Sequence, residues 1–385
     1  MAAGHTGGSS ESFDDGKFEA AFQAMLQMEK KDYPSYIGGL KVASGNDFPV
    51  NSPIDSSITF GRFQEPERGI ASAAVEAAAK AFIGWSALPA SERTACFVRA
   101  LEVLRAQRYK LAASVLLSTG MTKRESLAEA DRLIEVVSKE CAVAEYGNRK
   151  PTGVWGVIST HNSPLASPAG YAAAAMLAGN TAVVAPSGLC PLPVYIFYSI
   201  LESAGLPDGV LNLIVDSRDE THTELAENME LAGLVASGSG KNMEDMMFLQ
   251  VDDELRFVNE IKGMNPFIVH RPSDIKKAAK DIVDSAFVCA GQRLYSTSKA
   301  IVTADSQQKF TDAVLEYVRT VTVGDPADDA VAGPLISGKK MKEFFSLIES
   351  ARGRVIFGGK QVKGEFTSNG NYVAPAVIAG SDDDS

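Results

Sequence analysis

The sequence is poor in the residue types that build metal and disulfide sites: it has four cysteines and four histidines in 385 residues. The cysteines are widely scattered, and no two of them form a CxxC pair. A disulfide framework needs an even, closely spaced set of cysteines, and a zinc site needs clustered ligands. We therefore expect no metal centre, and we expect reduced thiols at Cys96, Cys141, Cys190 and Cys289.

Long apolar runs and blocks of positive charge are also missing. The longest apolar runs, such as YAAAAMLAG at 171–179, fall far short of the roughly 20 residues that a membrane-spanning helix needs. The formal charge of -11, with no basic block, argues against a nucleic acid or an anionic membrane surface as the main partner. The first residues lack the apolar core of a secretory signal. We expect a cytoplasmic protein that binds a small molecule or another protein.

Alternating apolar runs and helical patterns dominate the chain from residue 151 onward. The apolar runs are GVWGVIST, TAVVAP, VLNLIV and LAGLVASGS, and a second such series starts near 260. Strands buried on both faces are near-continuous apolar runs, and their alternation with helices indicates βαβ units around a parallel sheet. We predict a doubly wound, Rossmann-like α/β domain over 35–258 and a second α/β domain over 259–385, after a tail and short helix over 1–34.

Helical spacing of apolar residues precedes this core. It predicts a short helix over 18–31, with Asp14 or Asp15 as its cap. Long helices are predicted near 70–86, 91–117 and 123–146, the second with Ser91 in the N-cap position. Glycine and proline turns between short β-rich runs indicate hairpins around 36–63.

Several motifs, in order along the chain, resemble those of the aldehyde dehydrogenase superfamily. They are KPTGVWGVISTHNSPL, AGNTAVVAPS, ESAGLPDGVLN, NEIKGMNPFIV, CAGQR, VGDPADD, GPLIS and GNYVAPAV. The resemblance implies a cofactor-binding domain, a catalytic domain and NAD or NADP as cofactor. It also implies a chemistry: a cysteine thiolate attacks an aldehyde, an asparagine and a backbone N–H hold the oxyanion, and a glutamate activates water.

Two catalytic positions of that family carry over by resemblance. Asn162 matches the oxyanion asparagine, and its alternative role is that of a turn residue before Ser-Pro. Glu260 matches the general-base glutamate, and its alternative role is that of a solvated acid at a domain junction. The cofactor-binding positions that the resemblance implies are Ser159, Thr160, Ser187, Gly238 and Ser239.

The nucleophile of the family does not carry over. With Gly291 and Gln292 as the reference, the family's cysteine falls two residues after the glutamine, where this chain has Leu294. Leucine has no nucleophilic atom and no titratable proton. Cys289 lies five residues earlier, where the family commonly has an asparagine. It is either a displaced nucleophile or a small buried apolar residue, as most free cysteines are.

The cofactor site departs from the family pattern too. The family's Lys-Pro-Ser-Glu, which holds the adenine ribose, is replaced by Ala185-Pro186-Ser187-Gly188. Met243 stands where a glycine lets the pyrophosphate approach backbone N–H groups. Lys262 replaces a glycine beside Glu260, and its charge would lower the pKa of that carboxyl. We expect NAD or NADP to bind weakly or not at all.

Two segments of the family pattern are short in this chain. Few residues separate Tyr146 from PTGVWG, where the family has a hairpin, and the sequence stops at SDDDS, before the family's last catalytic-domain strands. We therefore expect a catalytic-type domain incomplete at its C-terminus. Because the hairpin and the last strand form the family's oligomerisation arm, the usual dimer is disfavoured and a protein partner could cover the exposed surface.

Three functions remain open at this stage. The first is a pseudoenzyme, folded but with little or no activity, that serves in binding or regulation. The second is an active aldehyde oxidoreductase in which Cys289 reaches a small aldehyde. The third is an esterase or dehydratase-like activity from His161, Ser163, Lys262 or Ser296. The N-terminal helix and the YIGG segment faintly resemble the glutamate-semialdehyde branch, but the block around Leu294 does not preserve the specificity residues, so the substrate stays open.

Overall fold

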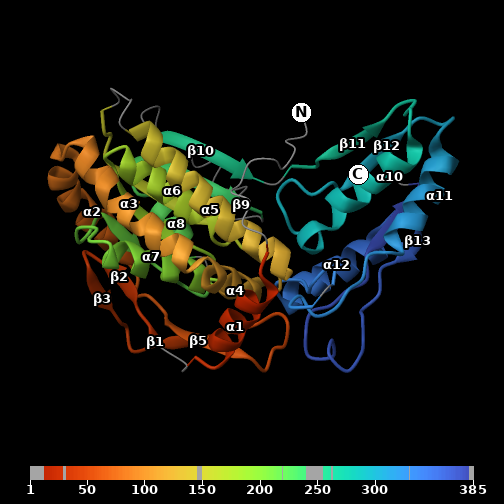
Figure 1. The fold of residues 1–385 in the computed structure, drawn as a ribbon, viewed down its shortest axis with the longest axis horizontal. Coiled ribbons are helices and arrows are strands. Elements are labelled where there is room, and N and C mark those ends of the chain that lie inside the picture. Colours follow the sequence, from red (N-terminus) through yellow and green to blue (C-terminus); the bar gives the residue numbers. More distant parts are fainter. Residues whose placement is uncertain are drawn as a thin grey trace.

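The computed structural model describes residues 13–28, 32–144, 150–218, 220–239, 255–261, 263–328 and 330–380. Two α/β units lie side by side, the larger running from red to green and the smaller from teal to blue in Figure 1. Across the described residues, no helix has the length and apolar character to span a membrane. The same residues hold no group of three or more His, Cys, Asp or Glu side chains placed to bind a metal ion.

A seven-stranded sheet forms the centre of the larger unit, in the order β10-β9-β6-β7-β8-β2-β3. The strands from β6 to β10 pair in parallel, and the β2–β3 hairpin closes one edge in antiparallel fashion. Every residue of β7 is buried, as its continuous apolar run predicts. The strands are β2 (Ser35–Ile37), β3 (Leu40–Val42), β6 (Val154–Ser159), β7 (Thr181–Ala185), β8 (Leu211–Leu213), β9 (Leu231–Gly238) and β10 (Arg256–Ile261).

Helices cover both faces of this sheet, which confirms the doubly wound α/β prediction. One hydrophobic cluster packs α2 and α8 against one face of the sheet. A larger cluster packs the helices α3, α4, α5, α6 and α7 on the other face. The helices of the first face are α2 (Ile70–Ala87) and α8 (Glu220–Ala226). Those of the second are α3 (Ala90–Ala106), α4 (Arg108–Thr119), α5 (Lys123–Ala144), α6 (Ala166–Leu177) and α7 (Leu192–Ser203).

The N-terminal segment adds one helix and a small sheet. Helix α1 (Asp15–Leu26) is capped by Asp14, whose side chain accepts a hydrogen bond from the Lys17 amide at 3.0 Å, so this cap is confirmed. Beside it, β1 (Asp32–Tyr33), β5 (Thr59–Gln64) and β4 (Asp47–Asn51) form a three-stranded sheet in that order. The predicted hairpins are the antiparallel pairs β2–β3 and β4–β5.

The long helix predicted over 91–117 is wrong, because the chain forms two helices that meet at Gln107. The backbone of that residue leaves the helical region, with φ -98 and ψ 15, which ends the first run of hydrogen bonds. Ser91 is not the cap either. Pro89 has an extended backbone with ψ 147, so α3 already begins at the next residue and Ser91 lies inside the first turn.

The described residues of the smaller unit form two short sheets and three α-helices. Parallel β11 and β12 pack on α10 and α11 in a third hydrophobic cluster, and β13 pairs with β14 in antiparallel fashion. The elements are β11 (Pro266–Val269), α10 (Ile275–Phe287), the 3-10 turn η1 (Val288–Gly291), β12 (Lys299–Val302), α11 (Gln307–Val318), α12 (Gly338–Ser350), β13 (Arg354–Gly358) and β14 (Ala376–Ala379).

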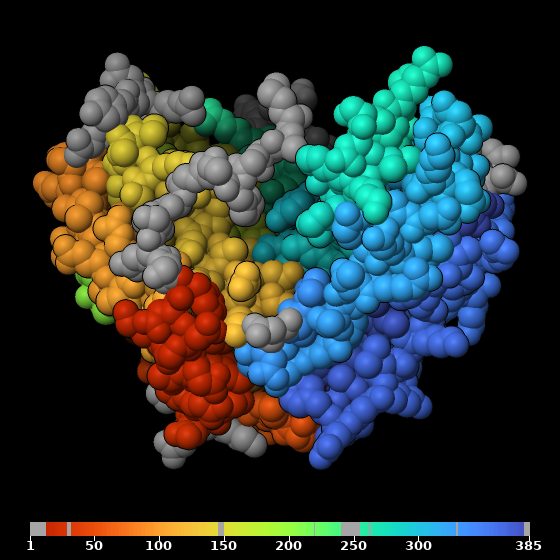
Figure 2. Space-filling model, turned by 45° about the vertical axis from the view of Figure 1, so that its right-hand side comes forward, coloured from red at the N-terminus to blue at the C-terminus, as the bar shows by residue number. Residues whose placement is uncertain are grey.

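The two units meet through backbone hydrogen bonds. The amide of Asn371 donates to the carbonyl of Pro53 at 3.2 Å, and the amide of Ser56 donates to the carbonyl of Asn369 at 3.0 Å. Figure 2 shows these orange and blue segments next to each other at the lower edge of the molecule. The expected domain boundary at 258–259 falls inside β10, whose six residues all pair with β9, so the larger sheet runs on to Ile261.

Candidate functional site

Because β6 and β9 are paired in parallel, their C-terminal ends lie side by side at the same edge of the sheet. Thr160 follows β6, and its amide donates to the carbonyl of Ser237 at 3.0 Å. Gly238 ends β9 with φ +154, and a Cβ atom there would lie 2.3 Å from the Thr160 hydroxyl oxygen. Glycine is therefore required at 238. The predicted positions Ser159, Thr160, Asn162, Gly238 and Ser239 thus gather at one edge of the sheet.

Hydrogen bonds engage both the oxygen and the nitrogen of the Asn162 side-chain amide. The side-chain amide donates to the carbonyl of Gln292, and the amide oxygen accepts from the hydroxyls of Thr160 and of Ser239, the latter at 3.2 Å. The residue is 3% exposed. One of the two N–H groups that would face an oxyanion is therefore already bonded to the backbone of the 288–296 loop.

The 288–296 loop carries Leu294 and is anchored at both ends. Cys289 and Ala290 have φ values of 50 and 54, a left-handed conformation that costs free energy for residues with a Cβ. The side-chain oxygen of Gln292 accepts from the amide of Ile336 at 2.9 Å, and the carbonyl of Leu294 accepts from Asn265 at 2.7 Å. The backbone of Leu294, the residue that the resemblance aligns with the family's nucleophile, is therefore held in place, and the residue is partly buried.

A buried ion pair lies beneath this loop. Arg293 pairs with Glu129, and their side chains are only 9% and 4% exposed. Glu129 also accepts hydrogen bonds from the Ser163 hydroxyl at 3.0 Å and from the Ala166 amide at 3.1 Å, while Arg293 donates to the carbonyl of Asn162 at 3.1 Å. Burial lowers the pKa of Arg293, but the charge and hydrogen bond of Glu129, together with the nearby Cys289 and Tyr295, raise it by more in total, so the guanidinium stays charged.

This ion pair was not predicted from the sequence, although one signal was present. Glu125 and Glu129 lie at helical spacing on α5, among buried positions such as Ser126 and Ala130. A carboxylate on the buried stripe of a helix needs a partner, because an uncompensated buried charge is costly. That partner is Arg293, next to Leu294 in the sequence.

Cys289 does not present a reactive thiol. The residue is 3% exposed, and its amide donates to Glu125 at 2.6 Å. Burial raises the pKa of the Cys289 thiol well above its usual range, and the nearby Arg293, whose Nε lies 3.1 Å from Sγ, offsets only part of that rise. Since the thiolate is the nucleophile, a thiol held protonated and enclosed is unreactive.

Glu260 lies on β10 with its side chain exposed. Its carboxylate accepts from the hydroxyl of Ser237 at 2.8 Å and from that of Ser167 at 3.4 Å. Burial raises the pKa of the neighbouring Tyr171, and the Glu260 charge adds to that rise. The Glu260 carboxylate is thus engaged by hydroxyl groups at the sheet edge. Lys262, the expected partner, lies outside the described residues.

Residues 185–188, the ribose-clamp segment, align with the family's adenine-ribose clamp but do not fit an adenine ribose. Ala185 is fully buried, and the Ser187 hydroxyl accepts from the Leu189 amide at 3.3 Å within its own turn. A Cβ atom at Gly188 would lie 1.9 Å from the carbonyl oxygen of Asp216, so the loop occupies the space that a glutamate side chain would need. No step through a nicotinamide cofactor follows from these residues. Met243 lies outside the described residues.

Comparisons with known proteins agree with the fold and its motifs. The model of the aldehyde dehydrogenase family matches residues 41–385. The chain is 30% identical to 1-pyrroline-5-carboxylate dehydrogenase of Geobacillus thermodenitrificans, over 97% of this chain and 78% of that protein. It is 27% identical to the alpha-ketoglutaric semialdehyde dehydrogenase of Bacillus subtilis, over 91% and 76%.

Solved structures show the same architecture. The 1-pyrroline-5-carboxylate dehydrogenase from Thermus with bound NAD superposes with a TM-score of 0.89 at 23% identity, over 98% of this chain and 78% of that one. HpcC from Thermus thermophilus gives a TM-score of 0.87 at 26% identity, over 94% and 75%. With the family model covering most of its length, the chain belongs to the aldehyde dehydrogenase family.

Proposed function

We propose that this chain is a non-catalytic member of the aldehyde dehydrogenase family, which keeps the fold but does not oxidise aldehydes. The observation that carries the proposal is Leu294 at the nucleophile position, in a loop whose backbone is tied to Asn265 and Ile336. Without a thiolate the aldehyde carbon has no attacking group, and no hemithioacetal can form. A role in binding is what the retained architecture supports.

The displaced-nucleophile alternative has less support. Cys289 would have to leave a buried position, break its contact with Arg293 and lose a proton that burial stabilises. Its backbone is also held by Glu125. Each of these contacts opposes the movement that would carry Sγ to a substrate.

The contacts of Ser163 and Ser296 give little support to the esterase or dehydratase alternative. Ser163 donates its hydroxyl to the Glu129 carboxylate, which the buried Arg293 already neutralises. A carboxylate in such a pair is a poor base, because taking a proton would leave the guanidinium uncompensated. Ser296 is buried, and its hydroxyl has no hydrogen-bond partner within the described residues, so no base stands ready to activate it.

The weakened cofactor site supports the same proposal. The clamp positions Ala185 and Gly188 supply no polar side chain for ribose hydroxyls, and Gly188 packs against the carbonyl of Asp216. We expect calorimetric titration with NAD or NADP to show no saturable heat at millimolar concentrations. Tight binding of either nucleotide would contradict this part of the proposal.

The decisive experiment is an activity assay with an internal control. We would supply 1-pyrroline-5-carboxylate and a panel of short aldehydes with NAD or NADP, and follow nicotinamide absorbance. The choice of the first probe follows the names of the similar dehydrogenases. We expect no reduction above the buffer rate. Reduction that is lost in Cys289→Ser but kept in Cys96→Ser, a thiol buried to the same 3%, would overturn the proposal.

A gain-of-function variant separates the missing nucleophile from the other losses. Leu294→Cys restores the thiol at the family's position, and Leu294→Ser is the matched control, with a similar size and a weaker nucleophile. Because the cofactor clamp is also absent, we expect the cysteine variant to react with thiol reagents and still to reduce no NAD. Efficient turnover by Leu294→Cys would show that leucine alone silences the site.

The oligomeric state is a separate proposal. Helix α5 ends at Ala144 and β6 begins at Val154, and the described residues 150–153 between them contain no strand. This short connection supports the absence of the family's oligomerisation hairpin and hence of its dimer. Light scattering coupled to size exclusion should give a single chain's mass, 40.9 kDa, and a stable dimer would contradict the proposal.

A further inference from the structure

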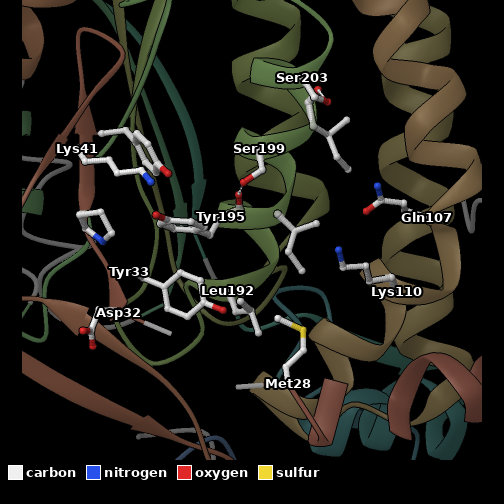
Figure 3. Close-up of a pocket in the computed structure, with 14 residues that line it drawn as sticks. Met28, Asp32, Tyr33, Lys41, Gln107, Lys110, Leu192, Tyr195, Ser199 and Ser203 are labelled. Carbon is white, nitrogen blue, oxygen red and sulfur yellow. Dashed lines mark hydrogen bonds between the residues drawn. The ribbon is translucent and has the colours of Figure 1, made fainter. Parts of the chain in front are cut away.

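A cavity of about 440 Å³ lies between α7, the start of α4 and the N-terminal strands, and its described lining residues include none of the site residues discussed above. Helix α7 forms one wall, with Leu192, Tyr195, Ile196, Ser199 and Ile200 at helical spacing along it. Figure 3 shows Lys41 and Tyr33 on one side of the cavity, Lys110 and Gln107 on the other, and Tyr195 between them. The volume is that of a small-molecule pocket, for which about 300–1,000 Å³ is usual.

Tyrosine rings make the apolar part of this cavity. Tyr195 packs edge-on against Tyr33, with ring centroids 4.7 Å apart, and lies 5.4 Å from Tyr36. Burial raises the pKa of Tyr33, and burial together with hydrogen bonding to Tyr36 raises the pKa of Tyr195 further. Their hydroxyls are therefore neutral at physiological pH. Fixed rings with polar tips suit a ligand that has both a flat apolar body and a polar end.

Two ammonium groups approach the cavity from opposite walls. Lys41 comes from β3 and Lys110 from α4, and both are exposed. Among the described residues neither side chain makes an ion pair. Among the described lining residues the one carboxylate is Asp32, which lies opposite Arg62 in the β1–β5 pair and adds to the rise that Asp47 causes in the pKa of that arginine. The cavity therefore has an excess of positive charge at its rim.

The wall that faces α7 includes the junction between α3 and α4. Gln107 is the residue at which the two helices meet, and Lys110 follows it in the first turn of α4.

We propose that this cavity, hereafter the tyrosine pocket, binds a small carboxylic acid with an aromatic body. The ring packs against Tyr33 and Tyr195, and the carboxylate pairs with an ammonium group at the rim, Lys41 on one wall or Lys110 on the other. A charge-assisted hydrogen bond to an ammonium group is stronger than a neutral one, so the lysines select the anion. The pocket uses none of the family's catalytic positions, and its test is independent of the proposed lack of oxidation.

The test uses the full chain and 3-phenylpropionate as probe, with binding measured by saturation-transfer NMR and calorimetric titration. The neutral amide of the same acid is the first control. We expect saturable binding of the acid and at least about tenfold weaker binding of the amide. No saturable binding of the acid, or equal binding of the amide, would overturn the proposal.

Variants then locate the site. Lys41→Gln with Lys110→Gln should weaken binding of the acid by about tenfold or more. Lys309→Gln with Lys342→Gln removes the same charge from exposed positions outside the pocket and should change affinity less than about twofold. If both double variants weaken binding equally, the attraction is to the overall charge and the pocket is not the site.

A blocking variant gives a test that does not depend on charge. Ser199 is exposed on α7 and lines the pocket, so Ser199→Trp places a large ring in the ligand's space. Ser346→Trp puts the same residue at an exposed position of α12 as the matched control. Circular dichroism checks that both variants fold. We expect only Ser199→Trp to abolish binding, and unchanged binding to that variant would refute the assignment.

Discussion

Replacing Arg293 with methionine should destabilise the folded protein more than any surface substitution. The change keeps the length of the side chain but leaves the Glu129 carboxylate, 4% exposed, without its counter-charge. The carboxylate would keep its hydrogen bonds from Ser163 and from the amide of Ala166. Removing one partner of a buried ion pair typically costs about 3–5 kcal/mol, because a charge is then stranded in a medium of low dielectric constant.

A second substitution shows where that cost arises. Glu129→Gln combined with Arg293→Met removes both charges, and the glutamine oxygen can still accept from Ser163 and Ala166. We expect the double variant to lose only about 1–2 kcal/mol, so that adding Glu129→Gln to Arg293→Met recovers about 2–3 kcal/mol of stability. Lys139→Met on the same helix removes an exposed pair with Glu135 and should cost under about 1 kcal/mol.

Urea unfolding followed by circular dichroism measures these free energies, and thermal melts check them. At about 2 °C per kcal/mol, Arg293→Met should lower the melting temperature by roughly 6 °C or more. Two results would refute the reasoning. One is an Arg293→Met variant as stable as Lys139→Met, and the other is a double variant less stable than the single.

Three further predictions follow from burial and close packing. All four cysteines are buried and burial raises the pKa of Cys141 to about 11, so the native protein should react slowly with a disulfide reagent and release four equivalents only after denaturation; one fast thiol would contradict this. Gly188→Ala should cost about 1–3 kcal/mol by urea unfolding, because its Cβ meets a carbonyl oxygen, whereas Gly84→Ala, with open space in α2, should be neutral or stabilising. Burial raises the pKa of Asp325, so the folded state favours the protonated carboxyl and is destabilised by the charged one above that pKa. Asp325→Asn should therefore raise the melting temperature at pH 7, and the gain should shrink as the pH falls through the raised pKa; a gain that is constant with pH would contradict this.

The parts of the fold that follow from periodicity could be predicted. Continuous apolar runs such as that of β7 indicated the parallel sheet. The resemblance to the family supplied Thr160, Asn162 and Gly238, which the structure brings to one edge of that sheet. Leu294 could be identified because Gly291 and Gln292 fix the position by counting along the chain. These inferences depend on local sequence alone.

The parts that depend on contacts between distant residues could not be predicted. The break at Gln107 carries no proline or glycine, so nothing in the local sequence distinguishes two helices from one. Pairing of Glu129 with Arg293 joins positions 164 residues apart, and no spacing rule connects them. The clash at Gly188 depends on where the chain before α8 passes, which only the packed structure defines.

The packing of Gly188 against Asp216 also bears on whether the family's cofactor clamp could be regained. Gly188→Glu would place a Cβ atom 1.9 Å from the backbone oxygen of Asp216, and this steric clash disfavours the substitution whether or not a ribose is bound. The loop before α8 would first have to shift, and that shift by itself brings no nucleotide affinity on which selection could act. A glutamate at 188 therefore requires at least two changes, one in the loop before α8 and one at residue 188 itself.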